Sequence, residues 1–198
     1  MRTANCPLGN TESNPYEKGQ IIINLIADTG SEQQIYIETG IYKIECVGAG
    51  SSGNGWYAGA AGYIMYGGGG SGSGFVGEYK LTKGTYKYRC GNGGTGNGGE
   101  GGASYILTTS TSTGIYAQGG RPGGYTQGGN DGGVLSIDSS LIIGTPQVKA
   151  NGNKGADGAI TTTDRAGGAS IYNGYGAGGS SRSAGSNGIL KITYLRLH

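Results

Sequence analysis

The chain has 198 residues, 47 of them glycine, and a formal net charge of +2. Its length fits one domain, and its 34% of hydrophobic residues is below the ~45–50% of ordinary globular chains, so any apolar core is small. Lysine and arginine stand singly, without an RGG repeat, and no apolar run approaches the ~20 residues of a membrane span. These features argue against nucleic acid as a partner and against a membrane span.

Residues 1–20 contain two prolines, several asparagines and no hydrophobic periodicity. We expect them to form an N-terminal docking arm, followed by a single domain over 21–198. The first residues also lack the apolar core of a signal peptide, which favours synthesis and folding in the cytoplasm or, alternatively, export as part of a larger assembly.

Short β-branched or alternating runs predict strands along the rest of the chain. The predicted strands are 21–27, 33–38, 41–47, 76–81, 86–90, 104–108, 134–137, 141–148 and 189–197. The turns at 39–40 and 82–84 each predict a hairpin between the strands that flank them. No stretch has helical periodicity, so the class is all-β. Strand 41–47 leads into the glycine-rich part and strand 189–197 leaves it, so we expect these two to pair.

Glycine recurs every third residue in five segments. In order, these glycines are Gly50, Gly53, Gly59 and Gly62; Gly93, Gly96, Gly99 and Gly102; Gly120, Gly123, Gly129 and Gly132; Gly152, Gly155 and Gly158; and Gly176, Gly179, Gly185 and Gly188. Trp56, Thr126 and Arg182 interrupt the repeat. Three residues per turn is the period of a polyproline II helix, which has no internal hydrogen bonds.

Side by side, such helices can bond to one another only where glycine lets their backbones meet. We therefore predict a small antiparallel β-sandwich, jelly-roll-like, that carries a bundle of glycine-rich polyproline II helices. In this arrangement residues 91–102, at ~3.1 Å each, form one rod of roughly 37 Å.

Three further classes of glycine-rich sequence fit this chain less well. Collagen needs an unbroken Gly-X-Y repeat rich in proline, and this chain has four prolines. A disordered low-complexity tract is the main alternative, but β-branched runs such as 21–26 and 41–47 oppose it. Gly48, Gly50 and Gly53 match the spacing of a dinucleotide-binding loop, yet no helix can form in the sequence that follows them.

The sequence predicts no catalytic residues, no metal site and no cofactor. His198 is the only histidine, and the carboxylates lie far apart in glycine or turn contexts, so we expect a protein that is not an enzyme. Cys46 and Cys90 each end a strand-like run, which favours buried free thiols. Whether any two of these and Cys6 form a disulfide stays open.

The chain has fifteen tyrosines and one tryptophan, several of them placed where glycine segments are interrupted. Aromatic residues flanked by Gly, Ser and Asn are typical of binding loops. The candidate receptor-binding residues are Trp56, Tyr57, Tyr125, Tyr172 and Tyr175. For each of them the alternative is that the ring caps the glycine-rich bundle and excludes water.

The order of GIYKIECVGAGSSG, FVGEYKL, GTYKYRCGNGGTGNGG and a closing SNGILKITYL resembles the glycine-rich domain at the ends of bacteriophage tail-fibre and adhesin proteins. It is also similar to the glycine-rich domain of the anaplastic lymphoma kinase ectodomain. The resemblance covers about residues 35–196. The chain departs from the phage pattern by having no long fibre shaft.

The phage resemblance implies a protein of the virion surface whose loops bind a bacterial glycan or outer-membrane protein. It further implies that the N-terminal arm docks on other virion proteins and that the chain forms a homo-oligomer, of which a trimer is one form. The alternative is a purely structural virion protein, such as a head fibre or a capsid or tail decoration. Ice binding is disfavoured because TTSTST at 108–113 lacks a regular period.

Overall fold

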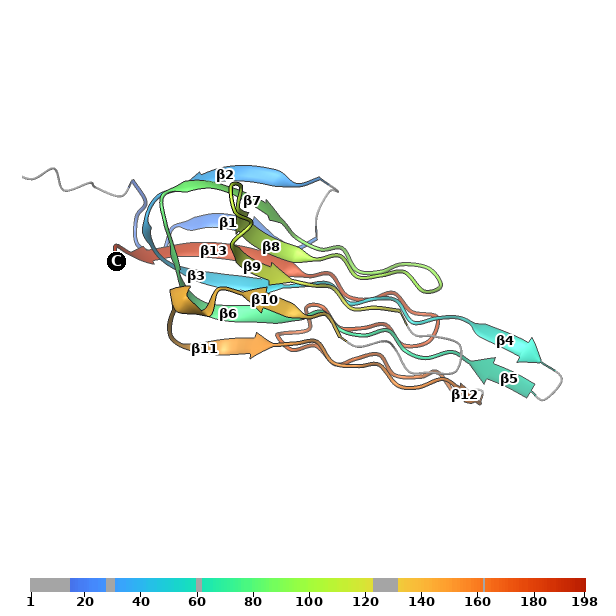
Figure 1. The fold of residues 1–198 in the computed structure, drawn as a ribbon. Helices are drawn as coiled ribbons and strands as arrows, with labels where there is room; N and C mark the ends of the chain where they lie inside the picture. Colours follow the sequence, from blue (N-terminus) through green and yellow to red (C-terminus); the bar gives the residue numbers. More distant parts are fainter. Residues whose placement is uncertain (1–14, 28–30, 60–61, 123–131, 162) are drawn as a thin grey trace, which may run out of the picture.

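The structure is a computed structural model that describes residues 15–27, 31–59, 62–122, 132–161 and 163–198. The described part is all-β, with two five-stranded antiparallel sheets packed as a sandwich. A glycine-rich body extends from one end of the sandwich, and the C-terminus lies at the other end (Figure 1). No helix among the described residues is long and apolar enough to cross a membrane. The prediction of an all-β sandwich is confirmed.

Each strand of the sandwich bonds to its neighbours in one of two sheets. The first sheet, sheet A, has the order β1 (Ile21–Leu25), β13 (Ile189–Arg196), β3 (Gly40–Val47), β6 (Gly74–Leu81) and β11 (Ile142–Ala150). The second, sheet B, has the order β10 (Leu135–Ile137), β9 (Gly114–Ala117), β8 (Ser104–Thr108), β7 (Gly84–Arg89) and β2 (Gln33–Ile37). A 3-10 turn, η1 (Ser139–Leu141), links β10 to β11.

The core lies between the two sheets and is built from alternate residues of their strands. Its largest fully buried side chains include Tyr42 and Ile44 from β3, Phe75 and Tyr79 from β6, and Ile106 from β8. Rings meet at edge-to-face angles, as in the pair Phe75–Tyr79 with centroids 5.9 Å apart. The alternation in the sequence thus marks the buried face correctly.

Residues 15–20 lie against the sandwich. The Tyr16 ring contacts the rings of Tyr42 and Tyr194 at centroid distances of 6.4 and 5.8 Å. The Gly19 N–H donates to the Tyr194 carbonyl (2.8 Å). The rest of the expected docking arm, 1–14, is outside the described residues.

All nine predicted strands are present, with ends shifted by one to a few residues, and β3 pairs with β13 as expected, Val47 opposite Ile189. Four further strands were not predicted from the sequence: β9 and the three short strands β4 (Trp56–Gly59), β5 (Gly62–Met65) and β12 (Ala159–Ile160). These three form a small sheet in the order β12-β5-β4 at the far end of the glycine-rich body (Figure 1).

Both predicted hairpins are wrong, because the chain changes sheet at each turn. Strand β2 belongs to sheet B and β3 to sheet A, while β6 belongs to sheet A and β7 to sheet B. At each crossing a tyrosine hydroxyl donates to the carbonyl four residues upstream: Tyr42 to Glu38 (2.7 Å) and Tyr86 to Thr82 (2.9 Å). Such tyrosine corners hold a chain that passes between the sheets of a sandwich.

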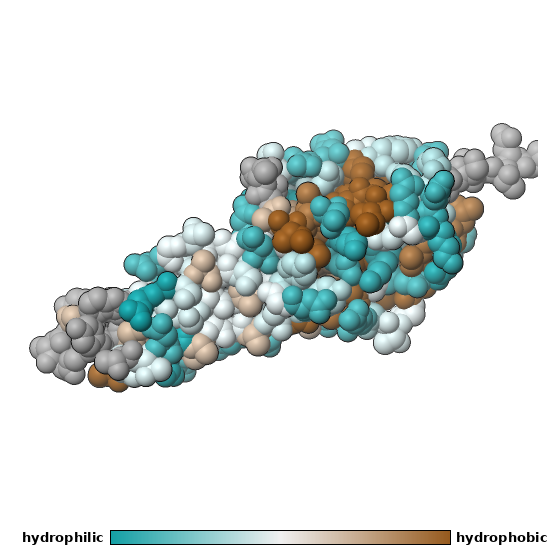
Figure 2. Space-filling view, turned by 180° about the vertical axis from the view of Figure 1, so that it is seen from behind, coloured by the Kyte–Doolittle hydropathy of each residue, from teal (hydrophilic) through white to brown (hydrophobic). Residues whose placement is uncertain are grey.

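The sandwich and the glycine-rich body differ in surface character. In Figure 2 the strongly hydrophobic side chains gather on the sandwich, among hydrophilic ones, whereas most of the body is pale and therefore of intermediate hydropathy. Buried hydrophobic residues of the body, such as Ala49 and Met65, are few among the described residues, so a hydrophobic core of its own cannot hold it together. Its cohesion has to come from its backbone.

In the glycine-rich body, backbone hydrogen bonds run sideways between extended segments. Residues 48–54 show the pattern: successive N–H groups donate in turn to three different neighbouring segments, and every third N–H group returns to the same segment. Gly48, Ser51 and Asn54 donate to Ser73, Gly70 and Gly67; Ala49 and Ser52 donate to Gly102 and Gly99; Gly50 and Gly53 donate to Ser186 and Ser183. Every neighbour is thus contacted at three-residue intervals.

Residues 68–73 repeat this rule around a second segment. Gly68 and Ser71 donate to Ala156 and Asn153, Gly69 and Gly72 to Gly179 and Gly176, and Gly70 and Ser73 to Arg121 and Gln118. Glycine is required because backbones touch: a Cβ on Gly50 would overlap the Ala177 carbonyl oxygen. The serines buried in this body bond through their hydroxyls, as Ser71 Oγ does in accepting from the Asn153 N–H (2.6 Å).

The single twelve-residue rod predicted for 91–102 is wrong. Gly102 donates to the Asn92 carbonyl (2.9 Å), so this segment runs out and folds back on itself. The turn contains Gly96 and Gly98, whose φ angles of 70° and 77° suit glycine. Arg182, where the triplet phase breaks, is also in a turn, at φ 68°.

Candidate binding surfaces

The candidate aromatic residues fall in two separate places, while Tyr125 lies outside the described residues. Trp56 and Tyr57 belong to β4, at the far end of the glycine-rich body (Figure 1). Tyr172 and Tyr175 lie where the body joins the sandwich, because the hydroxyl of Tyr172 reaches Glu45 on β3. Nothing in the sequence signals this division.

Tyr172 and Tyr175 flank a tight turn that fixes both backbones. Asn173 and Gly174 adopt φ angles of 47° and 81°, and the Tyr175 N–H donates to the Tyr172 carbonyl (2.9 Å). The Ser170 hydroxyl donates to the Tyr175 carbonyl (2.6 Å). The two rings stack with centroids 6.4 Å apart and an angle of 27° between their planes. This turn therefore presents a pre-ordered aromatic pair.

Glu45 anchors this turn to the outer face of sheet A. Its side chain is mostly buried, with Oε1 accepting from Tyr172 (2.9 Å) and lying 3.0 Å from Lys43 Nζ, while Lys191 Nζ is 4.0 Å from Oε2. Burial alone would raise the pKa of Glu45, but the hydrogen bonds from Lys43 and Tyr172 and the two lysine charges bring it below its usual value.

The Tyr172 hydroxyl is therefore used in a hydrogen bond within the protein. Burial and the bond to Glu45 raise the pKa of Tyr172 to about 12, so the phenol stays protonated and remains a donor. We assign Tyr172 the role of positioning the turn, which leaves Tyr175 as the aromatic residue that faces an open cavity.

A cavity of about 490 Å³ opens beside Tyr175. It is lined by Ile26, Asn173, Gly174, Tyr175, Gly185, Ser186 and Asn187. Ile26 is 56% exposed, and the Oδ1 atom of Asn187 is fixed by the Gly93 N–H (2.8 Å). The hollow is shallow and open to solvent, and its aromatic ring, aliphatic side chain and two amides are groups that can contact a ligand. Ile26 and Asn187 were missed, although the NG pairs at 173–174 and 187–188 signal turns.

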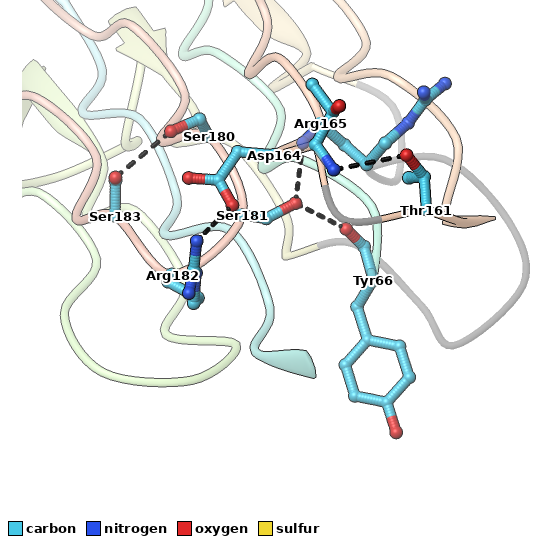
Figure 3. A network of polar contacts seen from close by, with 9 residues as sticks. Tyr66, Thr161, Asp164, Arg165, Ser180, Ser181, Arg182 and Ser183 are labelled. Atoms are coloured by element: carbon cyan, nitrogen blue, oxygen red, sulfur yellow. Dashed lines mark hydrogen bonds and ion pairs between the residues drawn. The ribbon is translucent and has the colours of Figure 1, made fainter. Parts of the chain in front are cut away.

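The far end of the glycine-rich body is held by a polar network (Figure 3). Ser181 Oγ donates to the Tyr66 carbonyl (2.7 Å) and accepts from the Arg165 N–H (2.8 Å), and Arg182 pairs with Asp164 (2.7 Å). The Tyr66 ring points away from this network (Figure 3). Ile160 on β12 is 67% exposed. This end thus offers apolar side chains on a fixed backbone.

Within the described ranges, no group of three or more His, Cys, Asp and Glu side chains is placed to hold a metal ion. Cys46 and Cys90 are buried and are not joined in a disulfide, as the sequence favoured, and Cys6 lies outside the described residues. The chain matches no protein-family model and no curated protein.

Proposed function

We propose that this protein is a non-enzymatic bacteriophage virion protein of the tail-fibre or adhesin type, which binds a bacterial surface glycan or outer-membrane protein. One observation carries the proposal: Tyr175 stands on a hydrogen-bonded turn beside a cavity of about 490 Å³ lined by two asparagines. A rigid aromatic ring next to adaptable amides is the composition of receptor-binding loops. The resemblance to phage glycine-rich domains supports the same conclusion.

We further propose that the glycine-rich segments are polyproline II helices and that the sandwich is jelly-roll-like. The threefold rotation of N–H groups in 48–54 and 68–73 is what a helix of three residues per turn requires. The repeated passage of the chain between sheets A and B is consistent with a jelly roll.

In the virion, we propose that the sandwich end docks on other virion proteins and that the glycine-rich body points outward. Figure 1 places the C-terminus at the sandwich end, away from the body. Ile21 and Leu197, near the two ends of the chain, are both more than half exposed and suit such a contact. We propose that the N-terminal arm, residues 1–20, makes the contact with other virion proteins, and that assembly as a homo-oligomer, for example a trimer, multiplies weak receptor contacts.

The test is competition for adsorption. Purified protein should block adsorption of the phage to its host cells, and Tyr175→Ala with Asn187→Ala should lose this block, whereas Tyr175→Phe should keep it. A parallel Trp56→Ala, Tyr57→Ala variant tests the far end separately. If the wild-type protein fails to compete, or if all variants compete equally well, the receptor-binding proposal is wrong.

The alternative is a purely structural part, such as a head fibre or a capsid or tail decoration. The observation that favours it is that the Tyr172 hydroxyl is bonded to Glu45, as expected of an aromatic residue that seals the base of the body. Immunogold electron microscopy of virions distinguishes the two proposals, because an adhesin should label the tips of fibres and a decoration protein should label a capsid or tail lattice.

A further inference from the structure

Two tyrosines on the outer face of sheet B form a second aromatic surface. Tyr105 on β8 and Tyr116 on β9 are directly opposite each other in the strand register, and their rings stack with centroids 5.6 Å apart at 16°. Tyr116 is 36% exposed. The Tyr105 hydroxyl donates to Glu32 (2.8 Å), whose carboxylate lies 3.9 Å from Lys87. Tyr105 is therefore anchored, and it supports Tyr116 from the side.

Tyr116 lines two hollows, one over β8, β9 and β10 and the other just beyond the ends of β8 and β9, where the glycine-rich body begins. The first, of about 380 Å³, is lined by Leu107, Ser112, Thr113, Gly114, Tyr116, Ser136, Ile137 and Asp138. The second, of about 170 Å³, is lined by Glu100, Gly101, Ala103, Tyr116, Gln118, Gly119, Gly120 and Arg121. Gly114 lies opposite Leu107, and a Cβ there would overlap the Ile106 carbonyl oxygen, so this part of the lining is held close to β8. A hollow, a ring and a second hollow thus follow one another in a line.

The polar groups around the first hollow are held in place. Asp138 Oδ1 accepts from both the Ser140 hydroxyl (2.7 Å) and the Ser140 N–H (3.0 Å). Thr113 is fixed at its N–H by the Thr108 hydroxyl (3.1 Å). This rim therefore combines a carboxylate with hydroxyl groups, while the second hollow contributes the side chains of Glu100, Gln118 and Arg121.

We infer that this face of sheet B binds an oligosaccharide, with one sugar ring stacked on Tyr116 and its neighbours in the two hollows. A sugar ring has an apolar C–H face that packs on an aromatic ring and an edge of hydroxyls that bond to carboxylates, amides and guanidinium groups. A nucleobase would also stack, but a phosphate attached to it would meet the Asp138 carboxylate in the first hollow, whose lining residues include no cationic side chain, while in the second hollow Glu100 accompanies Arg121. The linear arrangement favours at least two linked sugars over a single one.

This inference adds a second binding site, separate from the one at Tyr175, to the proposed receptor binding. It rests on the proposed function only in taking the saccharide to come from a bacterial surface. The probe is an array of bacterial lipopolysaccharide and capsular oligosaccharides, followed by titration calorimetry with the best-bound one. Tyr116→Ala should weaken binding by roughly tenfold or more, and Tyr116→Trp should retain it. Asp138→Asn should weaken it by a smaller factor.

Tyr36→Ala is the matched control, because Tyr36 is on β2 of the same sheet, is 51% exposed and lines neither hollow. It should bind the oligosaccharide as the wild type does, and unchanged melting temperatures would show that all variants fold. The inference is overturned if the array shows no binding, if Tyr36→Ala and Tyr116→Ala lose binding equally, or if Tyr116→Ala loses only binding to single-stranded oligothymidine. If the protein binds oligosaccharides on the array but does not block adsorption of the phage to its host cells, the proposed function is wrong and the inferred oligosaccharide site is retained.

Discussion

The hydroxyl of Tyr172 donates to Oε1 of Glu45 at 2.9 Å, across 127 positions of the sequence. This bond joins the turn beside the Tyr175 cavity to the outer face of β3, at the junction of sandwich and glycine-rich body. Glu45 is 7% exposed and lies between Lys43 and Lys191. The stability of the junction and the order of the candidate binding surface thus depend on the same carboxylate.

Tyr172→Phe should destabilise the protein by about 1 kcal/mol, because a hydrogen bond to a carboxylate is lost at a partly exposed position. Urea unfolding measures this free energy. The matched control is Tyr175→Phe, since the Tyr175 hydroxyl makes no hydrogen bond to any residue that the structure describes. Equal stability of the two variants would contradict the role assigned to Tyr172.

The ionisation of Glu45 should also contribute to the loss of stability of the protein in acid. Its pKa is lower in the folded state than in the unfolded chain, so its contribution to stability is complete above the unfolded value of about 4.3 and is lost as pH falls through the lower folded value. Melting temperatures measured from neutral pH to about pH 3 should therefore fall less steeply for Glu45→Gln than for the wild type.

The wild type should be the more stable of the two at neutral pH, with the difference narrowing in acid. Asp138 also has a lowered pKa, owing to its bonds from Ser140, but it is present in both proteins and cancels in the comparison. Parallel curves for wild type and Glu45→Gln across this range would show that the carboxylate is not coupled to folding.

The strands were predictable because alternation reports which side chains are buried, whatever the topology. The pairing of β3 with β13 followed from their positions at the entrance and exit of the glycine-rich part. The crossings between sheets were not predicted, since a glycine turn between alternating runs looks like a hairpin. The repeated G-x-Y-K at Gly40 and Gly84 was the available signal, because its tyrosine forms the corner.

The three-residue period of the glycine-rich body could be predicted from the sequence, but which segments lie next to one another could not. Contacts there join backbone to backbone, so no side-chain complementarity indicates that Gly50 meets Ala177. The candidate site was limited in the same way. Tyr172 and Tyr175 are close in sequence, whereas Ile26 and Asn187 reach the cavity from distant segments.

Cys46 and Cys90 should be unreactive in the folded protein. Burial, together with the nearby Cys90, raises the pKa of Cys46, and both thiols are buried. In a Cys6→Ser variant, Ellman's reagent should label these two cysteines only as fast as the protein unfolds, and at once in denaturant. Rapid labelling under native conditions would mean that the core around them opens without global unfolding.

Gly50→Ala should prevent stable packing of the glycine-rich body. The added Cβ would overlap the Ala177 carbonyl oxygen, a backbone atom fixed in its own segment, so we expect a loss of about 3 kcal/mol or failure to fold. Gly84→Ala is the matched control: it also lies in an extended segment, but a Cβ there has no atom within 4 Å. Its free energy of unfolding, from urea titration, should be unchanged or raised by up to about 1 kcal/mol. If both variants are equally stable, the close approach of backbones is not what makes glycine necessary at every third position.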